Sequence, residues 1–324
     1  MSEDPFEIDI TSIGHLIGQI TDIRLNRAAD LRAFAQARTR RERLTTDGKL
    51  VILAADHPAR MVTGALDNPV GLADRRQYLG RILRVLTGGG VDGLMGTPDV
   101  IEEVLAADIL HVESGQPSFL QNKLLVGCMN RGGLSGTAFD MLDSYTAYDA
   151  AGLAAMNLDA AKLMFRLEPE EPDCAQTILW SSQAVNACLD HSLPVFVEPL
   201  MVKKQGSKYV VQRDAENQMR ICGVASALGR SSLNTWLKLP FGPDYDRVAS
   251  STTCPILMLG GEAVADPMPL LRDMETGMQA GANVRGALIG RNVLFPGNRD
   301  PLLMARAVSR IVHEGVAAEA AMQE

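Results

Sequence analysis

The chain has 324 residues, of which 46% are hydrophobic and 22% charged, and its formal net charge is −8 at pH 7. This is an ordinary globular composition. The negative net charge argues against a general affinity for nucleic acid or an anionic membrane. One cationic pocket could still bind a small anionic substrate. No apolar run reaches the roughly 18 residues that span a bilayer, and MSEDPFEIDI at the start lacks an apolar signal region, so we expect a cytoplasmic protein.

Residues 12–45 are expected to be helical. Apolar residues recur on one helical face, at Ile13, Leu16, Ile17, Ile20 and Ile23. The segment ends in a basic run, ARTRRERL, which indicates a solvated helix face or, alternatively, a docking or subunit contact. We expect residues 1–48 to form a helical extension that contributes to a homo-oligomer.

From residue 50 onward, short aliphatic runs alternate with longer amphipathic segments. The eight runs are 50–56, 91–96, 123–129, 160–167, 194–201, 234–241, 255–261 and 285–291. Apolar strands that alternate with helices indicate parallel strands buried on both faces. Eight such units predict an α/β fold of the (β/α)8 TIM barrel class over residues 49–324. A Rossmann-like sheet is the alternative, but no GxGxxG turn follows the first run.

Details of the connections add to this prediction. The sixth and seventh runs lie so close together that their helix must be about two turns long. Two longer insertions, 130–152 and 203–216, follow the third and fifth strands, and the second is expected to be a hairpin around Gly206 and Ser207. Both insertions leave the carboxyl ends of strands, where barrels build their substrate sites.

The five cysteines include no CxxC pair, and the five histidines form no zinc-like cluster. We therefore expect reduced thiols in the core and neither a metal nor an organic cofactor.

Four charged residues lie within or at the end of predicted strands. They are Asp56, Lys162, Glu198 and Lys238. Each alone has a structural explanation, such as a turn cap or an ion pair. A barrel built only for stability would instead place Val, Ile or Leu there. Together the four form a set of two carboxylates and two lysines at one end of the barrel.

This set suits imine chemistry. A lysine must be neutral to attack a carbonyl, and desolvation or a second ammonium nearby lowers a lysine pKa. A carboxylate can move protons while the carbinolamine loses water, and a carboxylate can deprotonate the hydroxyl group whose carbon–carbon bond breaks.

Two glycine-containing turns follow the last two predicted strands. Gly260 and Gly261 follow the seventh, and Gly290 and Arg291 follow the eighth. Barrels often bind phosphate at these two positions through backbone N–H groups, and an arginine adds a charged donor. Ordinary turns are the alternative, and we expect a phosphate site.

These segments resemble those of the class I aldolases of the (β/α)8 type, which include archaeal-type fructose-bisphosphate, bacterial tagatose-bisphosphate and sulfofructose-phosphate aldolases. The resemblance spans residues 48–312 and rests on five short segments: AADHP, DAAKLMFRLEPEEPD, LPVFVEPL, LKLPF and GRNVL. It implies that Lys238 forms the Schiff base, that Glu198 is the acid and base, and that Asp56 and Lys162 assist imine formation. Gly261, Gly290 and Arg291 would then hold a phosphate.

The chain also departs from this pattern. Pro199 and Leu200 stand where the archaeal-type enzymes have a tyrosine, which favours the glutamate of the tagatose type. Arg60 is loosely comparable with the arginine of an Asp-Gln-Arg signature, and a surface position is its alternative. His57 beside Asp56 is a candidate acid.

The pattern is also similar to an aldolase-like bacterial family associated with inositol catabolism. That resemblance implies 5-dehydro-2-deoxygluconate 6-phosphate as a substrate, split into dihydroxyacetone phosphate and an aldehyde. Arg131, Lys203 and Lys204, in the two insertions, could meet its acid group.

We therefore expect a carbon–carbon lyase that acts on a small phosphorylated sugar or sugar acid. Acyl transfer on the same lysine barrel and a non-catalytic regulatory role are the alternatives.

Overall fold

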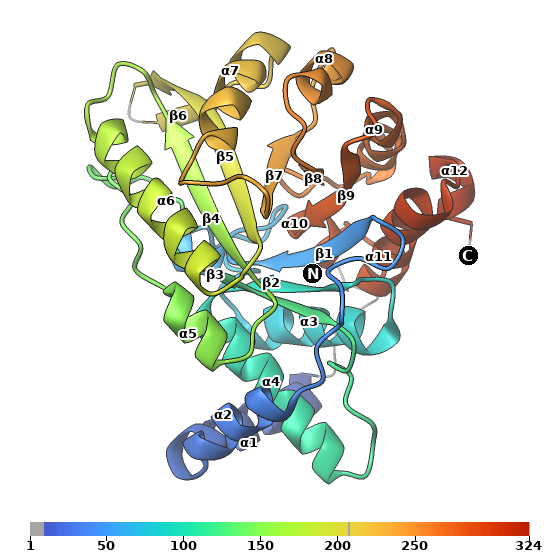
Figure 1. The fold of residues 1–324 in the computed structure, drawn as a ribbon. Helices are drawn as coiled ribbons and strands as arrows, with labels where there is room; N and C mark the ends of the chain where they lie inside the picture. Colours follow the sequence, from blue (N-terminus) through green and yellow to red (C-terminus); the bar gives the residue numbers. More distant parts are fainter. Residues whose placement is uncertain (1–9, 207, 324) are drawn as a thin grey trace.

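Eight parallel strands close into a barrel in the computed structural model, which describes residues 10–206 and 208–323 (Figure 1). The strands are β1 (Leu50–Ala55), β2 (Gly93–Gly96), β3 (Leu124–Cys128), β4 (Ala160–Leu167), β5 (Val195–Gln205), β7 (Thr235–Pro240), β8 (Ile256–Leu259) and β9 (Val284–Ile289). They pair in this order, and β9 pairs with β1 to close the ring. The predicted TIM barrel is confirmed, and the Rossmann-like alternative is wrong.

The apolar runs form barrel strands because both of their faces are buried. In β1 the alternate residues Leu50, Ile52 and Ala54 belong to the cluster that fills the barrel. Val51, Leu53 and Ala55 belong to the larger cluster that also includes helix residues. Side chains alternate between the two faces of a strand, so continuous apolar sequence is what a strand between two cores requires.

Helices surround the barrel. They are α3 (Arg75–Gly88), α4 (Pro98–Glu113), α5 (Ala150–Ala155), α6 (Asp173–Asp190), α7 (Ala215–Ser226), α8 (Tyr245–Ser250) and α9 (Met268–Gln279). The final segment contains α10 (Arg291–Leu294), α11 (Pro301–Ser309), the π-helical turn η2 (Arg310–Glu314) and α12 (Ala318–Ala321), and a short 3₁₀ turn, η1 (Pro58–Arg60), follows β1. The six-residue length of α8 confirms that the connection between the sixth and seventh predicted strands is short.

The amino-terminal helices are α1 (Ile10–Asn26) and α2 (Ala28–Ala37), which pack against α4 beside the barrel (Figure 1). Ile20 and Ile23 on the predicted apolar face are buried. The prediction that residues 38–45 continue the helix is wrong. The helix ends at Ala37 because the arginines that follow it are drawn into contacts at the amino-terminal end of the barrel.

The basic run is therefore not a solvated helix face. Arg38 pairs with Asp159 at 2.7 Å, and both side chains are almost fully buried. Arg40 also contacts Asp159, at 3.0 Å, and Arg41 contacts Asp92 at 3.0 Å. These ion pairs fix the segment that leads into β1.

His313 completes the polar cluster at this end of the barrel. Its Nε2 lies 3.0 Å from Asp92 Oδ2 and its Nδ1 lies 2.8 Å from Asp47 Oδ2. Its hydrogen bonds to Asp92 and Asp47 raise the pKa of His313, although burial opposes them. The imidazole thus links the π-helical turn to the segment before β1 and to the residue before β2.

The expected hairpin is confirmed: β6 (Lys208–Val211) pairs antiparallel with the end of β5. Ser207, at its turn, lies outside the described residues. The backbone N–H of Lys204 donates to Glu168 Oε2 at 2.7 Å, and the Tyr209 hydroxyl donates to Glu171 Oε1 at 3.1 Å. The acidic segment after β4 therefore holds the hairpin beside the barrel mouth.

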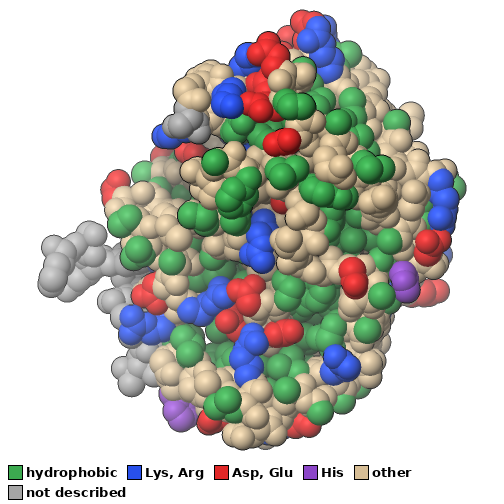
Figure 2. Space-filling model, turned by 90° about the vertical axis from the view of Figure 1, so that its left-hand side faces the viewer, with side chains coloured by type: hydrophobic (Ala, Val, Ile, Leu, Met, Phe, Trp, Pro, Cys, Tyr) green, Lys and Arg blue, Asp and Glu red, His purple; other side chains and the backbone are tan. Residues whose placement is uncertain are grey.

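Other predictions concern the surface and the thiols. All five cysteines are buried and free, as expected. Among the described residues, no helix is both long and apolar enough to cross a bilayer. Residues 1–9, on which the predicted absence of a signal region depends, lie outside the described residues. On the face shown in Figure 2, basic and acidic side chains are interspersed with hydrophobic ones.

Candidate active site

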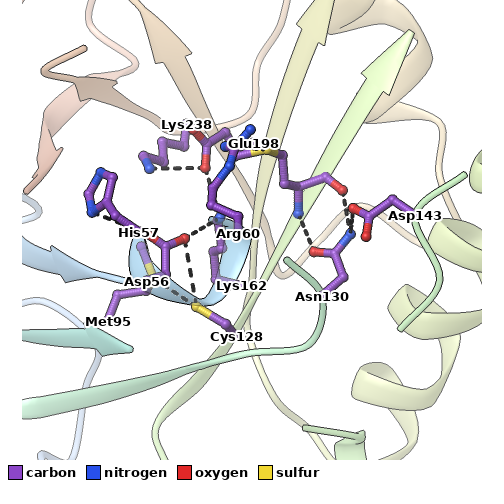
Figure 3. Close-up of polar contacts among 11 residues, drawn as sticks. Asp56, His57, Arg60, Met95, Cys128, Asn130, Asp143, Lys162, Glu198 and Lys238 are labelled. Carbon is purple, nitrogen blue, oxygen red and sulfur yellow. Dashed lines mark hydrogen bonds and ion pairs between the residues drawn. The ribbon is translucent and has the colours of Figure 1, made fainter. Parts of the chain in front are cut away.

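Four charged side chains meet inside the carboxyl-terminal half of the barrel (Figure 3). Lys162 Nζ lies 2.8 Å from Asp56 Oδ2 and 2.9 Å from Glu198 Oε2. Lys238 Nζ lies 2.9 Å from the same Glu198 oxygen. The residues come from β4, the end of β1, β5 and β7, so the sequence separations are large and barrel closure brings them together.

Burial strengthens the electrostatic interactions among these four side chains. Burial alone would raise the pKa values of Asp56 and Glu198, but the combined attraction of Lys162 and Lys238, with the hydrogen bond from Lys162, holds both pKa values below their usual range. Burial alone would lower the pKa of Lys162, but Asp56 and Glu198 raise it. Lys162 therefore remains an ammonium that keeps two carboxylates ionised.

The two lysines differ in their access to the barrel mouth. Lys162 is 0% exposed and lies beneath the cavity, whereas Lys238 is 6% exposed and lines the cavity. Below Asp56, the thiol of Cys128 lies 3.0 Å from Met95 Sδ. A substrate entering the mouth can therefore reach the Lys238 amine but not the Lys162 amine.

The cavity at the mouth has a volume of about 270 Å³. All the predicted site residues except Lys162 line it: Asp56, Arg60, Glu198, Lys238, Gly260, Gly261, Gly290 and Arg291. Val202, Tyr209 and Val211 of the β5–β6 hairpin form part of the wall. The insertion after β5 therefore shapes the cavity.

The two glycine turns lie side by side on one wall. Gly261 has φ +72°, and a Cβ added there would lie 3.1 Å from Arg213 Nη2. A Cβ at Gly290 would lie 2.5 Å from the Ala54 carbonyl oxygen. Asn292 joins the turns, because its amide donates to Gly260 O at 2.6 Å and accepts from the Val264 N–H at 3.1 Å. Both turns therefore line the cavity, and Gly290 has no room for a side chain because the Ala54 carbonyl oxygen occupies that space.

His57 also lines the cavity. Its Nδ1 lies 3.8 Å from Asp56 Oδ1 and is buried without a hydrogen-bond partner in the described part of the chain. Burial lowers the pKa of His57 to about 3, against the attraction of Asp56. The side chain is therefore a neutral imidazole at physiological pH.

The sequence reasoning missed two arginines that line the cavity, Arg166 and Arg213. Arg166 follows Lys162 and Met164 on the inward face of β4, so the alternation of side chains along a strand could have identified it. Arg213 follows β6, and no local signal in the sequence marks it. Beside Arg166, the Asn130 amide donates to Asp143 Oδ2 at 2.8 Å and to Met164 O at 2.7 Å, which fixes the start of the 130–152 loop.

The three cations that could meet the acid group of the substrate pair with groups of the protein. Lys203 pairs with Glu170 at 3.1 Å and Lys204 with Glu171 at 2.6 Å. Arg131 donates to the Ala59 carbonyl oxygen at 3.1 Å and to Thr146 Oγ1 at 3.0 Å. None of the three lines the cavity formed by the described residues, so their role at the acid group stays a prediction. The lysines anchor the hairpin.

No group of three or more His, Cys, Asp or Glu side chains suited to a metal occurs within residues 10–206 and 208–323. The functional groups at the mouth are a lysine amine, carboxylates, a neutral imidazole and several guanidinium groups. They can perform covalent amine chemistry and bind anions.

Comparisons with known proteins identify a family and support the barrel fold. The Cgl0159-like family model matches residues 48–312. The crystal structure of Cgl0159 from Corynebacterium glutamicum (Brevibacterium flavum) is 33% identical, with a TM-score of 0.86, over 93% of this chain and 98% of its own. No functionally curated protein gives a significant sequence match.

More distant structures share the fold. A Schiff base-forming fructose-1,6-bisphosphate aldolase is 22% identical with a TM-score of 0.58, over 82% of this chain and 95% of its own. An archaeal fructose-1,6-bisphosphate aldolase, solved with its catalytic lysine bound to a carbinolamine intermediate, gives the same identity and TM-score over 82% and 94%. The similarity to archaeal-type aldolases is thus confirmed for the barrel, while the tagatose-type and inositol associations stay predictions.

Proposed function

The chain belongs to the Cgl0159-like family, and we propose that it is a class I aldolase that cleaves a phosphorylated ketose or keto-deoxy sugar acid through a Schiff base on Lys238. The observation that carries this proposal is the chain of contacts from the cavity inward. Lys238 Nζ lines the cavity and contacts Glu198 at 2.9 Å, and Glu198 contacts the buried Lys162 at 2.9 Å.

Imine formation follows from these contacts. Glu198 Oε2 can accept a proton from Lys238 Nζ, which frees the amine to attack the substrate carbonyl carbon. Protonated Glu198 can then return this proton to the hydroxyl group of the carbinolamine, which leaves as water and yields a protonated imine. Lys162 stays charged throughout and stabilises Glu198 as a carboxylate after each transfer, because Glu198 and Asp56 raise the pKa of Lys162.

Cleavage uses the protonated imine as the electron sink. A carboxylate of the cluster removes the proton of the hydroxyl group on the carbon that will become the aldehyde. The carbon–carbon bond breaks, its electron pair moves toward the iminium nitrogen, and an enamine remains on Lys238. The enamine then takes up a proton on carbon, and water hydrolyses the imine to release dihydroxyacetone phosphate.

The glycine wall supports the phosphorylated end of this substrate. Gly260, Gly261 and Gly290 line the cavity beside Arg213 and Arg291. Backbone N–H groups with nearby guanidinium groups are a common phosphate site in barrels. 5-Dehydro-2-deoxygluconate 6-phosphate belongs to the proposed substrate class and is one compound to test.

Borohydride reduction with dihydroxyacetone phosphate tests the proposal, because it converts an imine into a stable amine that mass mapping can locate. The expected adduct is on Lys238, and Lys238→Met should abolish it. Lys49→Met is a matched control, because Lys49 contacts the Val312 carbonyl oxygen at the other end of the barrel. Active protein without any lysine adduct would refute the Schiff base.

A further inference from the structure

His57 lies between the buried charge cluster and the wall with the two glycine turns, and the proposed imine chemistry does not use it. Its carbonyl oxygen accepts from the Arg60 N–H at 3.1 Å and from the Val62 N–H at 3.2 Å, so the turn after β1 fixes its backbone. A Cβ added at Gly290 would lie 2.6 Å from His57 Cε1, so the ring packs directly against the glycine wall. The imidazole therefore has a defined position in the cavity.

The surroundings of the ring select one neutral tautomer. Nδ1 is buried, lacks a hydrogen-bond partner in the described part of the chain, and lies 3.8 Å from Asp56 Oδ1 (Figure 3). Lys162 contacts Asp56 at 2.8 Å and keeps it ionised. This carboxylate repels a nitrogen lone pair and attracts an N–H group. The proton therefore belongs on Nδ1, and Nε2 carries the lone pair.

Nε2 is the ring nitrogen that meets the cavity. The His57 side chain is 15% exposed, and this exposure lies on the Nε2 side because Nδ1 is buried. None of the described residues donates a hydrogen bond to Nε2. The ring therefore offers a ligand one uncharged acceptor.

The charges around the ring disfavour an imidazolium. The two carboxylates of the buried cluster already contact lysines. Burial lowers the pKa of Arg291, and Glu262 opposes this effect, so the charge of Glu262 acts mainly on that guanidinium. Burial also lowers the pKa of His57, against the attraction of Asp56, and the nearby charges of Arg291 and Lys238 lower it further. The charged side chains that line the cavity are Asp56, Glu198, Glu262, Arg60, Arg166, Arg213, Lys238 and Arg291.

The position of the ring decides which half of the substrate it meets. Strands β1 and β9 are neighbours in the barrel, so the turns that follow them, with His57 and Gly290, lie side by side. A substrate bound at Lys238 with its phosphate on the glycine wall places its dihydroxyacetone phosphate half beside His57. Apart from the nitrogen of Lys238, which contacts Glu198 at 2.9 Å, the hydroxyl group is the one hydrogen-bond donor on this half.

We propose that His57 Nε2 accepts a hydrogen bond from the hydroxyl group of the dihydroxyacetone phosphate half, which makes His57 a specificity-determining residue for the ketone. This inference rests on the proposed aldolase function. Hydroxyacetone phosphate has a hydrogen atom in place of this hydroxyl group and would leave Nε2 without a donor. A site that hydrogen-bonds a hydroxyl group disfavours the analogue that lacks it.

Two measurements test the proposal without any aldehyde. Borohydride trapping gives the concentration of each ketone phosphate that yields half of the maximal adduct on Lys238. Exchange of carbon-bound protons in deuterium oxide, followed by NMR, gives kcat/KM for enamine formation. His57→Leu should reduce the preference for dihydroxyacetone phosphate over hydroxyacetone phosphate by about 10-fold in both measurements, the usual effect of one buried acceptor. The adduct should still form with both ketones, which shows that the variant is folded.

Two further variants define the role of the ring. His57→Gln keeps an uncharged acceptor near the position of Nε2 and should retain most of the preference. Between pH 6 and pH 9 the preference of the wild-type protein should stay constant, because a neutral imidazole does not titrate in this range. Ser135→Ala is the control, because Ser135 also lines the cavity but lies in the 130–152 loop, and it should leave the preference unchanged.

Several results would overturn the inference. An unchanged preference in His57→Leu would place the hydroxyl group at another acceptor, such as Asp56. Loss of proton exchange in His57→Gln, with the adduct still formed, would mark His57 as a proton-transfer group. A preference that changes with pH in the wild-type protein but not in His57→Gln would show that the imidazole titrates. Adducts on Lys238 with any of these results would leave the aldolase proposal intact, whereas the absence of every lysine adduct in the wild-type protein would overturn both.

Discussion

Replacing Lys162 by Met removes the buried ammonium that joins two carboxylates. Lys162 is 0% exposed and lies 2.8 Å from Asp56 Oδ2 and 2.9 Å from Glu198 Oε2. Glu198 keeps Lys238 at 2.9 Å, while Asp56 loses the ammonium that contacts it. Breaking a buried ion pair by removing one partner costs about 3–5 kcal/mol, and we expect a loss of this size in the free energy of unfolding at neutral pH.

The loss should depend on pH. In the wild-type protein the pKa of Asp56 is lowered, so its contribution to stability is present above its unfolded pKa of about 3.9 and is lost as pH falls. In the variant, burial without Lys162 raises this pKa, so the folded state binds an extra proton and is destabilised as pH rises. The wild-type contribution is fully present at both pH 5 and pH 7.5, so the raised pKa of Asp56 in the variant makes the difference between the proteins larger at pH 7.5 than at pH 5.

Urea unfolding followed by circular dichroism at these two pH values measures the difference. The control is Lys162→Met combined with Asp56→Asn, which leaves one ammonium and one carboxylate in the cluster. This variant should recover part of the lost stability at pH 7.5. The reasoning would be refuted if Lys162→Met were as stable as the wild-type protein at pH 7.5, or if the added Asp56→Asn change reduced stability further.

Three other predictions concern single contacts. His313→Asn should destabilise the protein most below pH 6.5. The difference in stability between the variant and the wild-type protein should disappear as pH rises through the raised pKa of His313. Urea midpoints that differ between the two proteins by the same amount at pH 6 and pH 9 would contradict this. Gly261→Ala should weaken trapping of dihydroxyacetone phosphate, because Gly261 has φ +72° in the cavity wall. The control is Gly315→Ala, at φ +69° with open space around it, which should leave trapping unchanged. Arg38→Met should lower the free energy of unfolding by about 3–5 kcal/mol, because it leaves Asp159 buried beside only one arginine, and trapping should be unchanged.

The strands could be predicted from the sequence because each is a local pattern. Runs that are apolar on both faces form strands wherever a core lies on each side. Lys162 and Lys238 were recognisable as site residues because a charge inside such a run conflicts with the pattern. The same local evidence placed Glu198 and Asp56 at the mouth.

The remaining features depend on contacts between distant segments. The helix over residues 12–45 stops at Ala37 because Arg38 finds Asp159, which is 121 residues away. Lys203 and Lys204 turn away from the cavity because the acidic segment after β4 attracts them. Arg213 enters the cavity only after the hairpin has folded back. Local periodicity carries no information about such pairings.

The most direct test of the central claim is the location of the covalent adduct after borohydride reduction with dihydroxyacetone phosphate. The account predicts an adduct on Lys238, its loss in Lys238→Met and its persistence in Lys49→Met. An adduct on Lys162 instead would contradict the account, because Lys162 lies beneath the cavity as a permanent cation. Turnover without an adduct on any lysine would contradict it equally.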